Sequence, residues 1–454
     1  MRSIVFLFLC AFTALSQNKE VVDAIEWSNA GLKLDFVKQS QALRFDDIGG
    51  VADGKTANDA ILKKIFQTYP DGREIQFSEG VYYFEERIQL PGNFVLKGAG
   101  IDKTTFVFNL EKEHDLILTQ GQKTVDTVFF EQGVNRFDES ILIQENSTLK
   151  AGDWIILGDN DKDFVHSNWA WGKSGQIIKI EKIDGDKIFL EGQLRRDYHL
   201  QNKPYAVKLL PAEGAGIEKL SLKRRNQTKL QTSNIQFRFA VNCWVNNVRS
   251  DSTNYAHVLL EYAANCEVKN SHFAYGYDYG AGGKAYGVVL QFATSECAIM
   301  YNHFNHLRHA MLLQAGANGN VIIENESDNP YWKEPFLPKR AAGDLVLHGN
   351  YPYVNFFERN RIQNLVIDDS HGINGPYNVF ALNKVESYGI IMGNSPATDS
   401  LVFVGNEVSG KGIFKGKYRL KGNGHFEFAN RVKRKAIPKG TRMRPDYGIS
   451  IYRN

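Results

Sequence analysis

Residues 379–406 read VFALNKVESYGIIMGNSPATDSLVFVGN and contain one short pattern twice, as VFALN at 379–383 and as VFVGN at 402–406. Each copy is a β-rich run that ends in an asparagine. Comparable runs occur along the second half of the chain, and their final residues are Asn247, Asn270, Asn302, Asn325, Asn360, Asn383, Asn406 and Asn430. The intervals between these asparagines are 23, 32, 23, 35, 23, 23 and 24 residues. This regularity indicates a repeat architecture.

The repeat is too short for a strand–helix–strand unit, which needs about 30 residues or more. Short strands rich in Val, Ile, Leu and Phe between Gly, Asn and Pro turns fit one coil of a parallel β-helix instead. Coils stack about 4.8 Å apart, so an asparagine at a repeated turn can bond to its equivalents above and below. The sequence therefore predicts an all-β, right-handed parallel β-helix with an inward asparagine ladder.

The two long intervals indicate insertions into the repeat. They exceed it by about 9 and 12 residues, around 275–284 and around 328–342. In a solenoid such insertions form loops on one face, and they often border the binding surface. Candidate functional residues are therefore expected near these two loops.

The rest of the chain is divided by how well it follows the repeat. Residues 56–66 have helical spacing with polar capping candidates, so a helix here is expected to cover the open end of the solenoid. Residues 111–215 break the period, and their strand-like runs predict an antiparallel β insertion. The predicted divisions are 17–110 (cap and first coils), 111–215 (insertion), 216–430 (main β-helix) and 431–454 (C-terminal tail).

Residues 1–16 have the form of a signal peptide. One basic residue precedes the apolar run 4–12, and the segment ends at Ala14-Leu15-Ser16, a small-x-small cleavage pattern. A secreted or periplasmic protein is expected, and a lipid anchor on Cys10 is the less favoured alternative because a bulky residue precedes that cysteine. No later stretch reaches the roughly 18 to 20 apolar residues of a spanning helix, so no membrane insertion is expected.

Composition and charge exclude several classes of protein. With 43% hydrophobic residues, the chain has enough apolar surface for a large core and is not a disordered protein. One of the 54 Lys and Arg residues lies in the leader, so the mature chain has 53 against 51 Asp and Glu. That balance gives no general attraction to polyanions, so nucleic acid is not an expected partner. Separately, a monomer is expected.

Three cysteines remain after the leader, Cys243, Cys266 and Cys297. Each lies in a similar local context within the repeat. They are predicted to be buried apolar fillers, while a disulfide between the first two stays open.

Three segments near the N-terminus carry a family resemblance: FDDIGGVADGKTANDAI at 45–61, IQFSEGVY at 75–82 and FVLKGAG at 94–100. Together they resemble the opening of β-helix proteins of the pectate-lyase superfamily. The resemblance implies an exported protein that acts on carbohydrate polymers, because the superfamily holds lyases, polygalacturonase-like hydrolases, epimerases and phage tailspikes. No catalytic residue carries over, since neither a calcium-binding carboxylate set nor a close aspartate pair can be matched. Calcium stays open as a cofactor, and no metal ligands are assigned.

Counting back from the ladder gives one candidate row. His348 and His371 each lie twelve residues before a ladder asparagine, and Gln291 and Gln314 each lie eleven before one. In the strand 344–348, alternation predicts that Leu345 and Leu347 face inward while Asp344 and His348 face outward. Outward imidazoles suit proton transfer and amides suit sugar hydroxyls, although both histidines fit turn capping equally well.

A second candidate cluster lies in residues 302–309, which hold three histidines and Arg308. Cleavage of a uronate polymer by β-elimination needs a carboxylate neutraliser, a base and an acid. Arg308 is the candidate neutraliser, His309 or His348 the base, and Tyr277 or Tyr279 the acid. Residues expected to contact the polysaccharide are Gln291, Gln314, Tyr275, Tyr279, Trp332, Lys339, Arg340, Asp344 and Asp368.

Three alternatives remain beside the lyase. A glycoside hydrolase would need two carboxylates about 5 to 10 Å apart, for which Asp278, Asp344 and Asp368 are candidates. A non-catalytic glycan-binding solenoid would use the histidines only in turns. A zinc site among the histidines is the third alternative, although their spacing matches no standard zinc motif. The run 159–163 resembles the start of a calcium loop but lacks the Gly and Glu of such a loop, so this run is predicted to be a solvated turn.

Overall fold

The computed structural model describes residues 24–33, 42–144, 147–333, 342–393, 397–410, 416–433 and 435–436. The predicted signal peptide, Lys339, Arg340 and most of the predicted tail lie outside these residues. Among the described residues no helix is long and apolar enough to cross a membrane.

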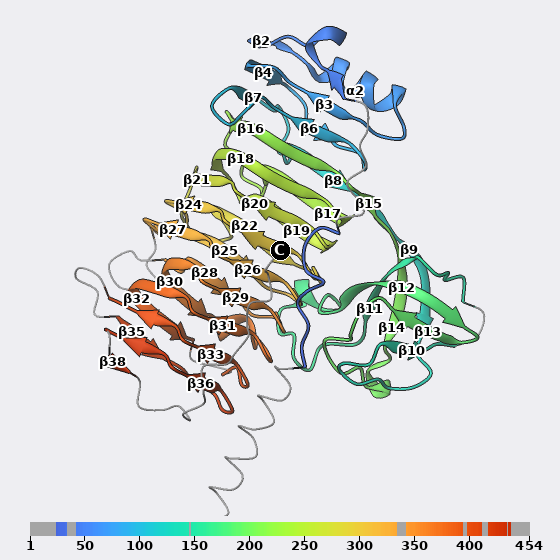
Figure 1. The fold of residues 1–454 in the computed structure, drawn as a ribbon, viewed down its shortest axis with the longest axis vertical. Coiled ribbons are helices and arrows are strands. Elements are labelled where there is room, and N and C mark those ends of the chain that lie inside the picture. Colours follow the sequence, from blue (N-terminus) through green and yellow to red (C-terminus); the bar gives the residue numbers. More distant parts are fainter. Residues whose placement is uncertain are drawn as a thin grey trace, which may run out of the picture.

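The chain winds into a parallel β-helix, which confirms the predicted fold class (Figure 1). Three parallel stacks of strands run along it. The stack that carries the candidate site consists of β5 (Ile88–Gln89), β8 (Ile117–Gln120), β17 (Ile235–Val241), β19 (Ala256–Ala264), β22 (Tyr286–Gln291), β25 (His309–Leu313), β28 (Leu345–Leu347), the second halves of β30 (Arg361–Ile367) and β32 (Lys384–Met392), and β35 (Lys417–Arg419).

The second stack contains the strands of the repeat that precede the ladder. It consists of β1 (Leu43–Arg44), β3 (Glu74–Gln76), β6 (Val95–Lys97), the first halves of β16 (Gly216–Arg224) and β18 (Trp244–Thr253), β20 (Glu267–Lys269), β23 (Ala298–Met300), β26 (Val321–Ile323), β29 (Phe356–Glu358), β31 (Val379–Ala381), β33 (Val402–Val404) and β36 (Phe426–Phe428).

The third stack follows the ladder turn in each coil. It consists of β2 (Asp53–Ala57), β4 (Gly80–Phe84), β7 (Thr104–Phe108), the second halves of β16 and β18, β21 (His272–Gly276), β24 (His303–Asn305), β27 (Glu326–Asp328), the first halves of β30 and β32, β34 (Glu407–Val408) and β37 (Arg431–Val432). Strand β38 (Lys435–Ala436) pairs antiparallel with β37, and β15 (Ala212–Glu213) pairs with β17.

The asparagine ladder forms where the second and third stacks meet. Each side-chain amide donates to the side-chain oxygen of the asparagine in the next coil, at 2.9 to 3.0 Å, through Asn302, Asn325, Asn360, Asn383, Asn406 and Asn430. The inward ladder is therefore confirmed for six of the eight predicted positions. A second buried ladder, which the sequence analysis did not find, links Asn320, Asn355 and Asn378.

The prediction is wrong by one residue at the first two positions. Asn247 and Asn270 have φ of 54° and 53°, and they align with Tyr301, which has φ of 59° and precedes the ladder residue Asn302. Ser271 occupies the ladder position in that coil and accepts the backbone N–H of Val248. Asparagine tolerates the left-handed turn conformation, so the residue type alone does not separate the turn position from the ladder position.

The interior is a column of stacked apolar side chains. The rings of Phe357, Phe380 and Phe403 lie 4.8 and 5.0 Å apart in successive coils. The same column holds three fully buried cysteines, Cys243, Cys266 and Cys297. All three are free thiols, which confirms the prediction that they are apolar fillers. Burial raises the pKa of the Cys243 and Cys266 thiols.

The N-terminal helix α2 (Asp59–Thr68) begins three residues later than expected and directs Leu62 and Ile65 into the first coil. The insertion forms a separate antiparallel sheet inside the expected 111–215 (Figure 1): β9 (Gln122–Phe129), β10 (Ser140–Leu142), β11 (Trp154–Gly158), β12 (Gln176–Asp184), β13 (Lys187–Leu190) and β14 (Tyr205–Leu210). Its Ile177 N–H donates to Ser295 Oγ of the solenoid at 3.0 Å.

Candidate functional site

Five polar side chains form a row on the outer surface of the first strand stack, and four of them lie at or directly after the carboxyl ends of their strands. The register pairs Glu261 with Gln291, and the positions after the paired strands continue the row through Gln314, His348 and Asp368. Gln291 Nε2 donates to Glu261 Oε1 at 2.6 Å, and Gln314 Nε2 donates to Gln291 Oε1 at 2.6 Å. The predicted alignment of the two glutamines with His348 is thus confirmed.

The prediction that His371 is the fourth member of the row is wrong. Asp368 occupies that position, and the chain then turns through the short 3-10 helix η6 (Asp369–His371). This turn brings the partly exposed His371 ring onto His348, with ring centroids 4.8 Å apart and an interplanar angle of 21°. One ligand-capable atom each of His348, Asp368 and His371 lies within 4.8 Å of the other two.

A stripe of rings crosses the same surface. Centroid distances are 4.9 Å from Tyr286 to His309, 6.1 Å from His309 to His348, and 4.8 Å from His348 to His371. The sequence predicts the histidine row and the cluster at 302–309 as two candidate groups. Arg308 and His348 are 40 residues apart in the sequence, yet the ring stripe joins the two groups into one cluster.

Arg308 lies at the end of this stripe and is only 7% exposed. Its guanidinium carbon is 5.6 Å from the Tyr286 ring centroid and 4.4 Å from that of Trp332. Nη1 donates to the Gly280 carbonyl at 2.8 Å, whereas Nε is buried without a hydrogen-bond partner. Within the described part of the chain no carboxylate forms an ion pair with Arg308.

Burial determines the protonation of the two inner imidazoles. Burial lowers the pKa of His309 well below its ordinary value, and the charges of Arg308 and His348 add to this effect. Burial also lowers the pKa of His348, against the opposing effect of Asp368. His309 Nδ1 lies 2.8 Å from the Gly343 carbonyl oxygen. Because a carbonyl can only accept, Nδ1 carries the hydrogen in the neutral ring and Nε2 presents the lone pair.

The predicted outward orientation of Asp344 is wrong. It is 1% exposed, while Leu345 and Leu347 face the core as expected. Its carboxyl is 2.5 Å from Ser327 Oγ and accepts the backbone N–H groups of Gln363 and Asn364. Burial raises the pKa of Asp344 to about 7. Asp344 precedes the strand β28, so strand alternation does not set its direction.

A different environment surrounds the three tyrosines at the end of β21 and in the loop after it. Tyr277 Oη donates to the Arg224 carbonyl at 2.6 Å, and Tyr279 Oη donates to the His306 carbonyl at 3.0 Å. The Tyr275 ring is 48% exposed and lies 5.6 Å from the His306 ring. Because two of these hydroxyls bond to backbone carbonyls, they serve the loop conformation rather than the ring stripe.

The other predicted carboxylates have structural partners. Asp278 forms ion pairs with Lys284 and Lys333, which lower the pKa of its carboxyl. The run 159–163 is not a solvated turn, because Asp159 and Asp161 are buried. Asp159 pairs with Arg196, and Asp161 accepts backbone N–H groups of residues 172–174.

The antiparallel insertion also reaches this surface. Lys173 Nζ lies 4.0 Å from the centroid of the Phe292 ring, directly after the strand that carries Gln291. Burial lowers the pKa of Lys173, while the charge of Glu261 opposes this shift. The insertion thus adds a cation beside the row.

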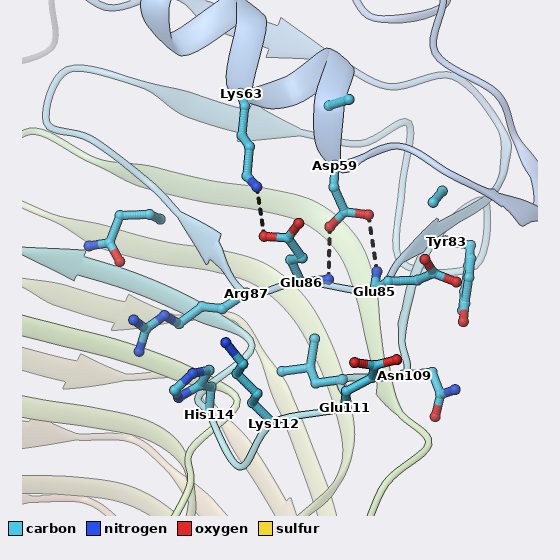
Figure 2. A pocket seen from close by; sticks show the side chains of 14 residues that line it. Asp59, Lys63, Tyr83, Glu85, Glu86, Arg87, Asn109, Glu111, Lys112 and His114 are labelled. Atoms are coloured by element: carbon cyan, nitrogen blue, oxygen red, sulfur yellow. Dashed lines mark hydrogen bonds and ion pairs between the residues drawn. The ribbon is translucent and has the colours of Figure 1, made fainter.

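A depression of about 900 Å³ lies at the N-terminal end of the solenoid, beside α2 (Figure 2). Three of its charged side chains bond to one another or to the backbone. Lys63 pairs with Glu86 at 2.6 Å, and Asp59 accepts the backbone N–H groups of Glu85 and Glu86 (Figure 2). None of the residues proposed from the sequence lines this depression.

Sequence reasoning missed two members of the site, Tyr286 and Glu261. Tyr286 is 23 residues before His309, so the repeat itself aligns the two, and attention to that interval would have found it. Glu261 is 30 residues before Gln291, with the first inserted loop between them, so no constant interval marks it. Burial raises the pKa of both side chains.

No protein-family model and no curated protein sequence matches this chain. Among solved structures, the chain is similar to the Gp54 tailspike of Acinetobacter baumannii bacteriophage AP22 in complex with A. baumannii capsular saccharide. The two share 12% sequence identity, the alignment covers 86% of this chain and 69% of that chain, and the TM-score is 0.52. It is also similar to a mutant tailspike of E. coli bacteriophage HK620 in complex with a pentasaccharide. The two share 11% sequence identity, the alignment covers 86% of this chain and 62% of that chain, and the TM-score is 0.50. The chain therefore has the right-handed parallel β-helix fold of these proteins.

Proposed function

We propose that this protein is a carbohydrate-active enzyme that cleaves an acidic polysaccharide by β-elimination at the ring stripe and polar row. The observation that carries the proposal is Arg308, a buried guanidinium that has no carboxylate partner among the described residues. A buried charge is costly unless it is paired. A uronate carboxylate is an anion that would pair with it.

The neighbouring groups fit the remaining steps of an elimination. Arg308 would pair with the uronate carboxylate and so acidify the C5 hydrogen of the sugar. His309 Nε2, neutral and holding a lone pair, would take that proton as the C4–O bond breaks and a C4=C5 double bond forms. The phenol of Tyr286, whose ring lies beside both Arg308 and His309, would give a proton to the leaving oxygen. Tyr286 replaces Tyr277 and Tyr279 in this role.

Hydrolysis by two carboxylates has less support on this surface. The row holds two carboxylates, Glu261 and Asp368, which are four coil steps apart. Glu261 is also held by Arg238, whose Nε lies 3.7 Å from its Oε2. At about 4.8 Å a step they are separated by about 19 Å, well beyond the roughly 5 to 10 Å that glycosidases use. Asp344 is buried, and Asp278 is held by two lysines.

The comparisons support the substrate class in outline. Both tailspikes described above were solved with bound saccharide, and their likeness to this chain is a likeness of fold. The leader at residues 1–16 supports export to the periplasm or the medium, where such polymers occur. We further propose that the protein acts as a monomer, with a polysaccharide and no nucleic acid as its partner.

The test uses mature protein and a panel of uronate polymers, with ultraviolet absorbance of the unsaturated product and reducing ends followed in parallel. Elimination raises both signals, whereas hydrolysis raises reducing ends alone. Arg308→Ala should lower kcat/KM by at least about a hundredfold, because it removes the only cation proposed to face the carboxylate. The matched control is Arg249→Ala, since Arg249 forms an exposed pair with Asp102 on another strand stack.

Each result has one meaning. Absorbance that appears with wild type and Arg249→Ala, but not with Arg308→Ala, supports the proposal. Reducing ends without absorbance would replace elimination with hydrolysis. Binding of a polymer with neither signal would make the protein a non-catalytic glycan-binding solenoid.

A further inference from the structure

His348, Asp368 and His371 lie close enough together to surround one ion. Their ligand-capable atoms are all within 4.8 Å of one another, and His348 Nε2 is 3.8 Å from Asp368 Oδ2. Ligand atoms about 2.1 Å from a tetrahedral zinc ion are about 3.4 Å apart from one another. Small rotations of these side chains would therefore be enough to close the set around an ion.

No hydrogen bond among the described residues uses either nitrogen of His348 or Oδ2 of Asp368. His348 Nδ1 is buried without a partner among the described residues, and the 3.8 Å between Nε2 and Asp368 is too long for a hydrogen bond. Asp368 Oδ1 accepts the Ser370 N–H at 3.0 Å, which fixes the carboxylate and leaves Oδ2 directed at His348. Buried polar groups are almost always paired, so an imidazole in this state indicates a ligand.

The surrounding chain holds the three residues in place. Asp369, between two of them, is buried and accepts Thr398 Oγ1 and Asn374 Nδ2. Gly349 has φ of 78°, and a Cβ there would lie 2.7 Å from backbone and Cβ atoms of His371. A glycine next to His348 is therefore what allows the η6 turn to bring His371 over that ring.

We propose that His348, Asp368 and His371 form a binding site for one divalent transition-metal ion, with zinc as the best match. Two imidazoles and one carboxylate suit zinc and its neighbours in the first transition row. Calcium prefers six to eight oxygen ligands and is disfavoured by two nitrogens, so the calcium left open by the sequence does not belong at this position. Three protein ligands would leave a coordination position for water or a sugar oxygen.

The site goes beyond the proposed elimination, because His309, Arg308 and Tyr286 are not among its ligands. The test measures zinc chloride binding by titration calorimetry to untagged mature protein that has been treated with a chelator and dialysed. We expect one zinc ion per chain. Asp368→Asn and His371→Ala should each weaken binding by at least about a hundredfold, because each removes a direct ligand.

His303→Ala is the matched control. His303 also faces a carboxylate, Asp328, at 3.1 Å, but within the described part of the chain no third ligand completes a set there. This variant should bind zinc as wild type does. Thermal unfolding of each metal-free variant establishes that the fold is retained, and His371 is the safer position because it is partly exposed.

Two results would overturn the proposal: no zinc binding by the wild-type chain, or unchanged binding in both Asp368→Asn and His371→Ala. Calcium chloride, titrated in parallel, should bind much more weakly than zinc, and tighter calcium binding would contradict the donor-set argument. Because zinc binding is read without polysaccharide, the result stands whether or not the protein cleaves a uronate polymer.

Discussion

The asparagine ladder should be a major source of stability, and Asn360 is the position at which to measure it. Its side-chain oxygen accepts the backbone and side-chain N–H groups of Asn325, both at 3.0 Å. Its amide donates to the Ile322 carbonyl and to Asn383 Oδ1, both at 2.9 Å. Asn360→Ala removes all of these bonds from a fully buried position.

The expected loss follows from what each partner keeps. The Asn325 side-chain amide still reaches the carbonyls of Ile299 and Ile323, and Asn383 Oδ1 still accepts the Asn360 backbone N–H. The Asn325 backbone N–H loses its acceptor, at about 2 kcal/mol, and the three other lost bonds contribute about 1 kcal/mol each. We therefore expect the free energy of unfolding to fall by about 5 kcal/mol.

The assay is equilibrium unfolding in urea, followed by tryptophan fluorescence. Asn360→Ser is the informative second variant, because Ser271 fills the same row and still accepts a backbone N–H from the adjacent coil. It should lose about half as much as Asn360→Ala. The control, Asn305→Ala, removes a single exposed bond to Asn329 and should change stability by less than about 0.5 kcal/mol. A loss below about 1 kcal/mol in Asn360→Ala would refute the reasoning.

Three further predictions concern the site. Tyr286→Phe should lower kcat on a uronate polymer by about a hundredfold or more with little change in KM, because only the proton donor is lost; an unchanged kcat would exclude that role. The pKa of Asp344 is about 7 in the folded protein and about 4 in the unfolded chain. The folded state therefore binds the proton more tightly, and the free energy of unfolding should fall as pH rises between these two values. Asp344→Asn should remove that slope, as measured by urea unfolding across this pH range, and a slope that persists would contradict it. Gly349→Ala should displace His371 and weaken zinc binding in calorimetry, whereas wild-type affinity in this variant would show that the close approach is not required.

Much of the candidate site could be predicted because its members repeat with the coils. Gln291 and Gln314 are 23 residues apart, so they had to stack if the repeat was a β-helix coil. His348 then follows in the same row despite the second insertion. Strand alternation placed Leu345 and Leu347 in the core for the same reason.

Predictions failed where the chain leaves the regular strand. Asp344 precedes a strand, and its direction is set by bonds to Ser327 and to the next coil. His371 follows a strand that ends four residues before it, so counting residues placed it in the row that Asp368 occupies. Tyr277 lies in an inserted loop, where the conformation depends on the carbonyl of Arg224, two coil steps away.

The sequence by itself determined the solenoid, its period, its apolar column and most of the ladder, because these follow from local strand preference repeated at a nearly constant interval. Only the tertiary structure decided that Arg308, Tyr286, His309 and the cluster of His348, Asp368 and His371 share one surface. Their proximity depends on the stacking of coils of unequal length and on turns such as η6, which the interval between residues does not encode. Burial likewise exists only once the coils have stacked. It lowers the pKa of the His309 and His348 imidazoles, and it encloses the Arg308 guanidinium, which has no carboxylate partner among the described residues.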